Sequence, residues 1–362
     1  MKRLNMTAVG LLALSIQPLV SDEAGADEVR EYLVTMTKPN QLHLIDPEVQ
    51  EIVRSCDVNG DVFGPGTIQL SPDNLTAYVI HNRWEEVVGV DLTNCEEVFR
   101  AHGGRGNIRA KSIASLAVSP DGSQVYVVWD RVKMGLDHYQ VLEPQLAVYE
   151  TDAGLLAEPV RTYPAPRQVT IMDADMDGDL YLAGADIYRM DPDTGDIETV
   201  IPNRNWDRPE FSGPDSLAIW ANGEVTREFL RPYTSAKLKD GNPVSYHWGI
   251  SRVDLDSGET ENKEIGPMEF IVFSMVSDPD DPDTIYGAYT QLSHFDAEKN
   301  EIVKVLDLDH TYYSINISHD GETIYVGGAS ADIVIYDTDF NRLGQIRMPG
   351  DMSTSTLKVA RF

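Results

Sequence analysis

A short β-hairpin phrase that returns along the chain constrains the fold more than any other feature of this sequence. Segments 68–79, 116–127 and 315–326 read IQLSPDNLTAYV, LAVSPDGSQVYV and INISHDGETIYV. In each phrase, Asp followed by Gly or Asn suits the positive φ of a tight corner, and apolar residues alternate on both sides. Each phrase therefore predicts two antiparallel strands joined by a tight turn.

A second phrase, a strand that ends at an Asp or Thr before another turn, follows these hairpins. It occurs at 87–92 (VVGVDL), 146–151 (LAVYET), 187–195 (IYRMDPDTG), 250–258 (ISRVDLDSG) and 333–339 (IVIYDTD). Together the two phrases define six complete units that begin near Thr67, Ser115, Val169, Asp215, Phe270 and Tyr313. Their spacing of about 40 to 55 residues is the period of four-stranded propeller blades.

The two ends of the chain complete a seventh unit. Segment 32–58 contains the later strands of a blade but no first strand, and segment 353–362 (STSTLKVARF) is a lone alternating strand. Pairing the C-terminal strand with the N-terminal blade would remove the open sheet edges of the ring. The sequence therefore predicts an all-β, seven-bladed β-propeller, closed by the C-terminal strand, as a single domain over 27–362.

The strand order also assigns the connections to two faces of the ring. In a propeller, the turns between the first and second and between the third and fourth strands of each blade lie on one end, here called the short-turn face. The loops between the second and third strands and the links between blades lie on the other end, the long-loop face. We expect the long insertions 131–144 and 232–246 on the long-loop face, where binding is usually placed.

The N-terminus is typical of a secreted protein. Lys2 and Arg3 precede an apolar run over 6–20, and Ala24-Gly25-Ala26 supplies the small-residue pattern of a cleavage site. We expect a signal peptide over 1–26 and a periplasmic mature chain. The apolar run is about 15 residues long, short of the ~20 that span a bilayer. No membrane span is expected after cleavage.

Charge narrows the possible partners. The chain of 362 residues has 29 Lys and Arg against 59 Asp and Glu, a formal net charge of −30. Such a surface repels phosphate backbones and anionic lipid, so nucleic acid is not an expected partner. An oxidising compartment would permit a disulfide between the two cysteines, Cys56 and Cys95, although their spacing alone does not decide whether they pair.

The chain has no recognisable motif for a cofactor. There is no C-x-x-C-H haem run, dinucleotide G-x-G-x-x-G, phosphate loop or H-E-x-x-H zinc motif. Asp173-x-Asp175-x-Asp177-Gly178 begins like a calcium loop, but Gly184 stands where a bidentate Glu is needed, so an acidic hairpin turn is preferred. The eight His residues show no metal-ligand spacing. No catalytic, cofactor-binding or metal-binding residue is predicted in this chain.

Aromatic and His residues on the expected long-loop face are the candidate site residues, because aromatic side chains with a polar tip suit protein contacts and partly wet pockets. Packing between blades is an equally good interpretation of such residues. The candidates for a subunit interface or pocket are Tyr312, Tyr313, His138, Tyr139, Tyr233, Tyr246, His247 and Trp248.

Several segments resemble one known family. They are 165–170 (APRQVT), 188–192 (YRMDP), 287–289 (GAY), 295–300 (FDAEKN), 312–318 (YYSINIS) and 327–329 (GGA). Together they resemble the β subunit of quinohemoprotein amine dehydrogenase, and the similarity runs from about Glu31 to Phe362. Because it includes segments of the long-loop face, this resemblance is more specific than the propeller repeat alone.

The resemblance implies a periplasmic α-β-γ complex that oxidatively deaminates primary amines. Its α subunit carries two c-type haems and its small γ subunit carries cysteine tryptophylquinone. The β subunit is a propeller without a covalent cofactor that helps enclose the γ subunit and shape the substrate channel. On this view Cys56 and Cys95 are not quinone precursors, and whether the chain counts as an enzyme depends on its complex. The alternative is a stand-alone periplasmic propeller enzyme, such as a lactonase-like hydrolase, which the lack of a combined His and carboxylate constellation disfavours.

Overall fold

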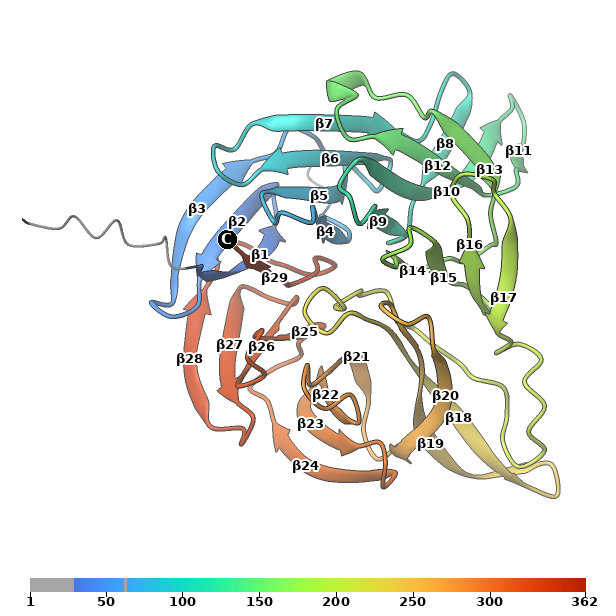
Figure 1. Cartoon of the computed structure of the whole chain (residues 1–362), viewed down its shortest axis with the longest axis vertical. Helices are drawn as coiled ribbons and strands as arrows, with labels where there is room; N and C mark the ends of the chain where they lie inside the picture. Colours follow the sequence, from blue (N-terminus) through green and yellow to red (C-terminus); the bar gives the residue numbers. More distant parts are fainter. Residues whose placement is uncertain (1–28, 62–63) are drawn as a thin grey trace, which may run out of the picture.

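The computed structural model describes residues 29–61 and 64–362, and the expected signal peptide over 1–26 lies outside them. Seven β-sheets stand in a ring around a common axis, in chain order from the blue blade to the red one (Figure 1). The predicted seven-bladed propeller is confirmed. The described residues form one short 3-10 helix, η1 (Gly154–Leu156). Among them no helix has the length and apolar character needed to cross a membrane.

Five blades are regular four-stranded antiparallel sheets, each with its first strand nearest the axis. Blade 1 is β29 (Lys358–Arg361), β1 (Glu31–Thr37), β2 (Gln41–Asp46) and β3 (Glu51–Asp57). Blade 2 is β4 (Ile68–Leu70), β5 (Thr76–His81), β6 (Glu86–Asp91) and β7 (Glu97–His102). Blade 4 is β14 (Ile171–Ala174), β15 (Leu180–Ala183), β16 (Ile187–Met190) and β17 (Ile197–Ile201). Blade 6 is β21 (Val272–Ser277), β22 (Thr284–Tyr289), β23 (Gln291–Asp296) and β24 (Glu301–Asp307). Blade 7 is β25 (Ser314–Ile317), β26 (Thr323–Gly327), β27 (Asp332–Asp337) and β28 (Arg342–Arg347).

The C-terminal strand closes the ring, as predicted. β29 pairs antiparallel with β1, with Leu33 opposite Val359 and Val34 opposite Lys358. Leu33 and Val359 lie in one buried cluster with Leu357 and with Ile333 of blade 7. The last residues of the chain therefore join its first strand both to the sheet ladder and to the neighbouring blade.

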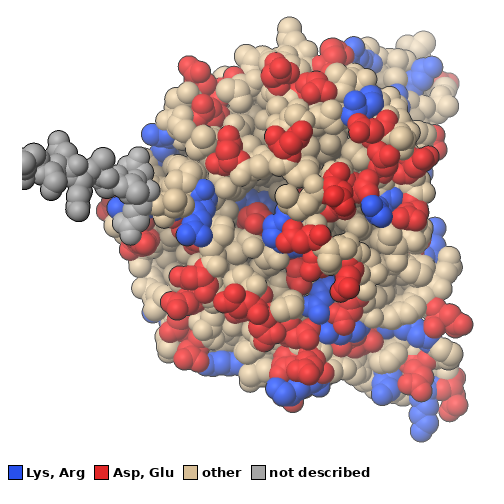
Figure 2. Space-filling model, in the orientation of Figure 1, with Lys and Arg blue, Asp and Glu red and all other residues tan. Residues whose placement is uncertain are grey.

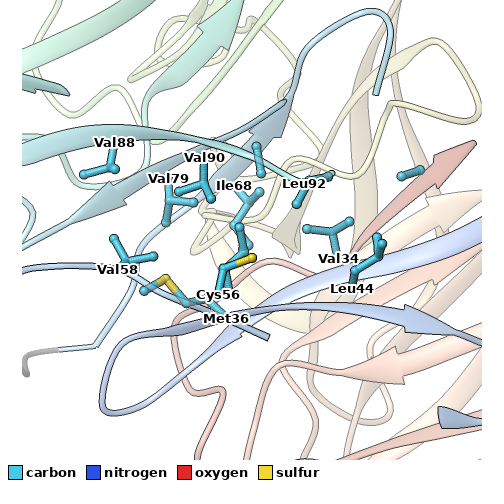
Figure 3. Close-up of a cluster of buried hydrophobic side chains, with 13 residues drawn as sticks. Val34, Met36, Leu44, Cys56, Val58, Ile68, Val79, Val88, Val90 and Leu92 are labelled. Atoms are coloured by element: carbon cyan, nitrogen blue, oxygen red, sulfur yellow. The ribbon is translucent and has the colours of Figure 1, made fainter. Parts of the chain in front are cut away.

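Apolar side chains pack between adjacent blades, and Figure 3 shows the cluster between blades 1 and 2. Val34 and Leu44 of blade 1 belong to this cluster together with Val79 and Val88 of blade 2. In each of these two blades, the strands bury alternate side chains against the neighbouring blade, as in other sheets that pack face to face. Cys56 and Cys95 form a disulfide across this junction, with Cα atoms 5.1 Å apart.

Blade 5 departs from the predicted six complete units, because its sheet has only three strands. They are β18 (Glu228–Lys239), β19 (Asn242–Asp254) and β20 (Thr260–Pro267), and residues 216–227 in the first-strand position form no strand. Gly223 lies so close to Glu228 that a Cβ there would be 2.1 Å from its carbonyl oxygen. Glu224 next to it bonds to blade 1 instead of to its own sheet, since it accepts the Val359 N–H at 3.0 Å.

The two long insertions are hydrogen-bonded strands rather than the loops that the sequence predicted. Segment 232–246 is most of the β18–β19 hairpin, which turns at Asp240-Gly241 and extends beyond the ring at the lower right of Figure 1. Segment 131–144 belongs to blade 3, where β10 (Gln124–Met134) continues past its partners in the ring. The blade's other strands are β8 (Ile108–Lys111), β9 (Leu116–Val118), β11 (Tyr139–Val141), β12 (Gln145–Glu150) and β13 (Arg161–Pro164).

Candidate functional site

A three-stranded flap stands on the long-loop side of blade 3. It consists of β8, the second half of β10 and β11, with β10 in the middle. Asp130 lies opposite Lys111, Val132 opposite Arg109, and Met134 opposite Tyr139. Residues directly opposite each other in a ladder share one face of the sheet, and every second residue along a strand does the same. These six side chains therefore share one face of the flap.

That face lines a pocket of about 440 Å³ against a loop of blade 2. The loop contributes Trp84, and the link into blade 3 contributes Ile113. The lining is mainly apolar and aromatic with a few charged groups, which is the usual composition of a ligand or side-chain pocket. The lining residues are Trp84, Arg109, Ala110, Lys111, Ile113, Asp130, Val132, Met134 and Tyr139.

The charged groups of this pocket differ in their partners. The Lys111 ammonium donates to the Arg83 carbonyl at 2.9 Å, and the Arg109 guanidinium pairs with Glu85. The Asp130 carboxylate has neither an ion pair nor a hydrogen bond among the described residues. Burial raises the pKa of Asp130, and the charge of Arg167 opposes that shift. Asp130 is therefore a half-buried acid without a bound cation.

A second feature of the long-loop face is a cluster of four aromatic rings from blades 5, 6 and 7. Phe273 stacks on Tyr289 with ring centroids 4.1 Å apart, and Tyr313 lies 5.3 Å from Phe273. Trp220 contacts both Phe273 and Tyr313 at about 6 Å. Next to it, a pocket of about 220 Å³ includes Phe273 together with the exposed Leu217 and Ile271. This part of the face is apolar.

Polar side chains of the innermost segments form a network near the axis of the ring. The Glu224 carboxylate accepts hydrogen bonds from Lys358 Nζ at 2.9 Å and from the Asn316 amide. Lys358 is fully buried and also donates to the Ala221 carbonyl at 2.6 Å. Asp173 lies in the same interior region, where burial raises its pKa against the charge of Lys358. Because Glu224 and Lys358 bond to each other, their main effect is to hold blades 1, 5 and 7 together.

The structure separates the eight candidate residues by burial. Tyr312 and Tyr233 are buried in the chain itself, so they are packing residues, whereas Trp248 is also buried but lines the pocket of about 220 Å³ beside the aromatic cluster. The Tyr312 hydroxyl donates to Asp332 at 2.9 Å, and the Trp248 indole donates to the Phe270 carbonyl at 3.0 Å. Tyr233 packs so tightly on Gly249 that a Cβ there would be 2.2 Å from its ring.

The other five candidates remain accessible, but they do not gather at one place. Tyr139 lines the flap pocket, while His138 is exposed at the flap tip and bonds to Asp137. Tyr313 belongs to the aromatic cluster. Tyr246 is exposed on the β18–β19 hairpin, and the neighbouring His247 is half-buried, bonds to Ser245 and has its pKa lowered by burial.

Sequence reasoning did not single out the residues that give the two apolar sites their character. Trp84 and Asp130 define the flap pocket, and Phe273 and Trp220 define the aromatic cluster. β8, in the link between blades 2 and 3, pairs with the insertion part of β10. No local sequence pattern predicts this pairing. The one available signal is the alternation in RVKM over 131–134, which is typical of a strand rather than a loop.

The short-turn face has a different chemistry. Its Asp residues accept backbone N–H groups of their own turns, as Asp121 does from Ser123 at 2.9 Å and Asp254 from Ser257 at 2.8 Å. The calcium-like segment is such a turn, since Asp175 accepts the N–H groups of Asp177 and Asp179. Within 29–61 and 64–362, no group of three His, Cys, Asp or Glu could hold a metal ion. Figure 2 shows acidic side chains spread over the visible side of the ring.

Comparisons with known proteins show the fold only. No family model and no curated protein sequence matches the chain. Among solved structures, the dihydro-heme d1 dehydrogenase NirN in complex with DHE matches with a TM-score of 0.52 and 16% identity, over 90% of this chain and 74% of that one. Hydrazine synthase of Kuenenia stuttgartiensis matches with a TM-score of 0.53 and 14% identity, over 88% of this chain and 95% of that one. Apo AztD from Citrobacter koseri matches with a TM-score of 0.51 and 13% identity, over 92% of this chain and 98% of that one. At such identities these proteins show a shared propeller architecture and nothing about activity.

Proposed function

We propose that this chain is the non-catalytic propeller subunit of a periplasmic amine dehydrogenase complex of the quinohemoprotein type. Its long-loop face would receive the small quinone-bearing γ subunit, and a di-haem α subunit would complete the complex. The cysteine tryptophylquinone and the haem c would be held by these partners. The proposal rests on the resemblance of segments such as 312–318 and 327–329 to the β subunit of that family.

One structural observation supports this choice of face: exposed large apolar side chains are more numerous on its connections than on the short turns, which expose Val49, Leu156 and Met176 among others. Leu136 at the flap tip is fully exposed, and Tyr139 is 73% exposed. Where such groups are neighbours, as Leu136, Tyr139 and Val141 are along the flap, they usually mark an interaction surface. The exposed residues of this kind on the long-loop face are Ile113, Leu136, Tyr139, Val141, Leu217, Val244, Tyr246 and Ile271.

Purification of the tagged chain from the periplasm of its native organism tests the proposal. We expect a haem protein and a small quinone-staining protein to elute with it, and the eluate to reduce a dye when a primary amine is added. The chain alone should show no haem or quinone absorbance and no amine turnover, because such redox chemistry needs a cofactor. Amine turnover by the isolated chain would contradict the proposal, and lactone hydrolysis by it would favour the hydrolase alternative.

A matched pair of variants tests the choice of face. Val141 on the flap and Val49 on the short-turn face are both well exposed, at 65% and 59%. Val141→Asp should reduce the amount of γ subunit that co-purifies, whereas Val49→Asp should leave it unchanged. Loss with Val49→Asp alone would place the interface on the opposite face.

A further inference from the structure

The flap pocket has a chemical preference that the proposed function does not specify. Its two cations are already engaged by the blade 2 loop, Lys111 with the Arg83 carbonyl and Arg109 with Glu85. Its remaining charged group, Asp130, makes no ion pair or hydrogen bond among the described residues; the charge of Arg167 acts on it, but the Arg167 guanidinium donates to the Leu142 carbonyl at 3.2 Å instead. A carboxylate placed among apolar walls attracts a cation, because its charge is poorly solvated there.

The walls of the pocket suit the stem of a long side chain. Trp84, Ile113, Val132 and Met134 present apolar surface beside Asp130, and Tyr139 adds an aromatic ring at the rim. Lys and Arg side chains bury an apolar stem while their charged head meets a polar partner. A cationic head near Asp130 and an apolar stem along these walls would satisfy both parts of the pocket.

The surroundings of the pocket favour a protein as the source of that cation. Val141 lies opposite Val132 of the pocket wall, and Leu136 follows Met134 in the turn of the same flap. Both are exposed, and a free small cation inside the pocket would leave both uncovered. A polypeptide that inserts one cationic side chain would bring neighbouring residues over them. We propose that the flap pocket receives a Lys or Arg side chain of a partner protein, with its charged head at Asp130 and flanking apolar residues against Leu136 and Val141.

This proposal concerns recognition and holds whatever complex the chain joins, so it can be tested on the isolated chain. The chain has five Trp residues, and 5-fluorotryptophan labelling gives each a ¹⁹F resonance. Trp84→Phe assigns the Trp84 line. The probe is Nα-acetyl-lysine N-methylamide, and its neutral match is the same molecule acetylated at Nε.

The charged probe should shift the Trp84 line saturably and leave the other Trp lines in place. The neutral match should bind about tenfold more weakly, the factor that corresponds to one lost charge contact. Asp130→Asn should weaken the charged probe by a similar factor. Asp137→Asn, which removes the same charge from the exposed flap tip, should not change its affinity. Absence of a saturable shift, or equal binding of the two probes, would overturn the proposal even if Asp130→Asn failed to fold.

Two further probes identify the source of the cation. The tripeptide acetyl-Leu-Lys-Leu-amide should bind several-fold more tightly than the lysine probe, because its Leu side chains can cover Leu136 and Val141. Free n-butylammonium should bind no more tightly than the lysine probe. A tripeptide without advantage, or n-butylammonium as the tightest of the three, would overturn the assignment to a protein partner and indicate a small-molecule site.

Discussion

The two faces of this ring are made by the same seven blades, yet only the short-turn face repeats the same local structure from blade to blade. On the short-turn face, blade after blade closes its turn with an Asp that accepts backbone N–H groups, as at Asp121, Asp191, Asp254 and Asp320. On the long-loop face, a flap, a protruding hairpin and an aromatic cluster each occur once. The turn carboxylates of the repeated face accept hydrogen bonds within their own blades. The face without repetition presents the exposed Leu136 and Tyr139 on the same flap as the Asp130 carboxylate, which has no ion pair among the described residues, so a partner protein would gain most by binding there.

Both faces depend on one closed ring, so removal of the closure should have the largest effect. Deletion of 353–362 removes β29, the buried Leu357 and Val359, and Lys358, which bonds to Glu224. Each buried aliphatic side chain contributes about 1.5–3 kcal/mol, and a domain has only about 5–15 kcal/mol in all. We expect no folded monomer by circular dichroism and thermal melting. An unchanged melting transition would show that the faces do not depend on closure.

A milder change at the same end serves as the control for that deletion. Phe362→Ala removes the ring that stacks on Tyr32 at 4.9 Å but leaves the β29 ladder in place. This variant should fold and melt cooperatively at a somewhat lower temperature. If this variant failed to fold, the effect of the deletion would come from loss of the Phe362 side chain rather than from loss of the β29–β1 pairing that closes the propeller.

Variants of two adjacent tyrosines should distinguish a residue of the buried scaffold from a residue of the long-loop face. Tyr312→Ala removes a buried ring stacked on His310 and a hydroxyl bonded to Asp332, so it should cost about 4 kcal/mol in the free energy of unfolding. Tyr313→Ala removes one half-buried ring of the aromatic cluster and should cost about 1 kcal/mol. Urea unfolding measures both. Equal costs would contradict the assignment of Tyr313 to the accessible face.

As the pH falls, the protein should lose the stabilisation from a buried histidine before it loses that from the carboxylates of the short turns. His43 is buried between Thr37 and Ser55, which bond to its two ring nitrogens, and burial lowers its pKa from 6.5 to about 4. The unfolded chain therefore takes up the proton first, so this contribution is complete above pH 6.5 and is lost as the pH falls to about 4. The loss should reach about 3 kcal/mol.

The turn carboxylates titrate in a lower range. Hydrogen bonds from Ser119 and Ser123 hold the pKa of Asp121 at about 2, so its stabilisation persists above pH 3.8 and is lost as the pH falls toward 2.

Urea unfolding of the wild type and of His43→Gln between pH 7 and pH 4 checks the sign of the predicted His43 contribution to stability. A wild-type chain that loses no more stability than His43→Gln over this interval would refute the role of His43.

A small effect is also predicted for a single turn of the repeated face. Asp121→Ala removes the acceptor of the Ser123 N–H and of two Ser hydroxyls, and it should cost about 1 kcal/mol in stability. Co-purification of the partner subunits should be unchanged. Asp121→Asn keeps an acceptor oxygen and should cost less. A loss of partner with intact stability would move the interface to the short-turn face.

The same contrast explains how much the sequence predicts. The repeated turns carry their own chemistry, so the strands, the blade count and the closing strand follow from phrases such as 116–127 and from the lone segment 353–362. The burial of Tyr233 could not be predicted, since it depends on the approach of Gly249 from the facing strand. The missing first strand of blade 5 depends on bonds between Glu224 and blade 1, more than 130 positions away in the chain. Non-local pairing of this kind has no local sequence signal.

Hydrogen exchange measured by mass spectrometry on the chain alone and in its native complex tests the central claim most directly. If the long-loop face is the interaction surface, the complex should slow amide exchange in the flap (131–142), in the hairpin tip (237–246) and around Phe273. Exchange in the short turns near Asp121, Asp191 and Asp254 should stay the same. Protection confined to those short turns, with the flap and hairpin unchanged, would contradict the account.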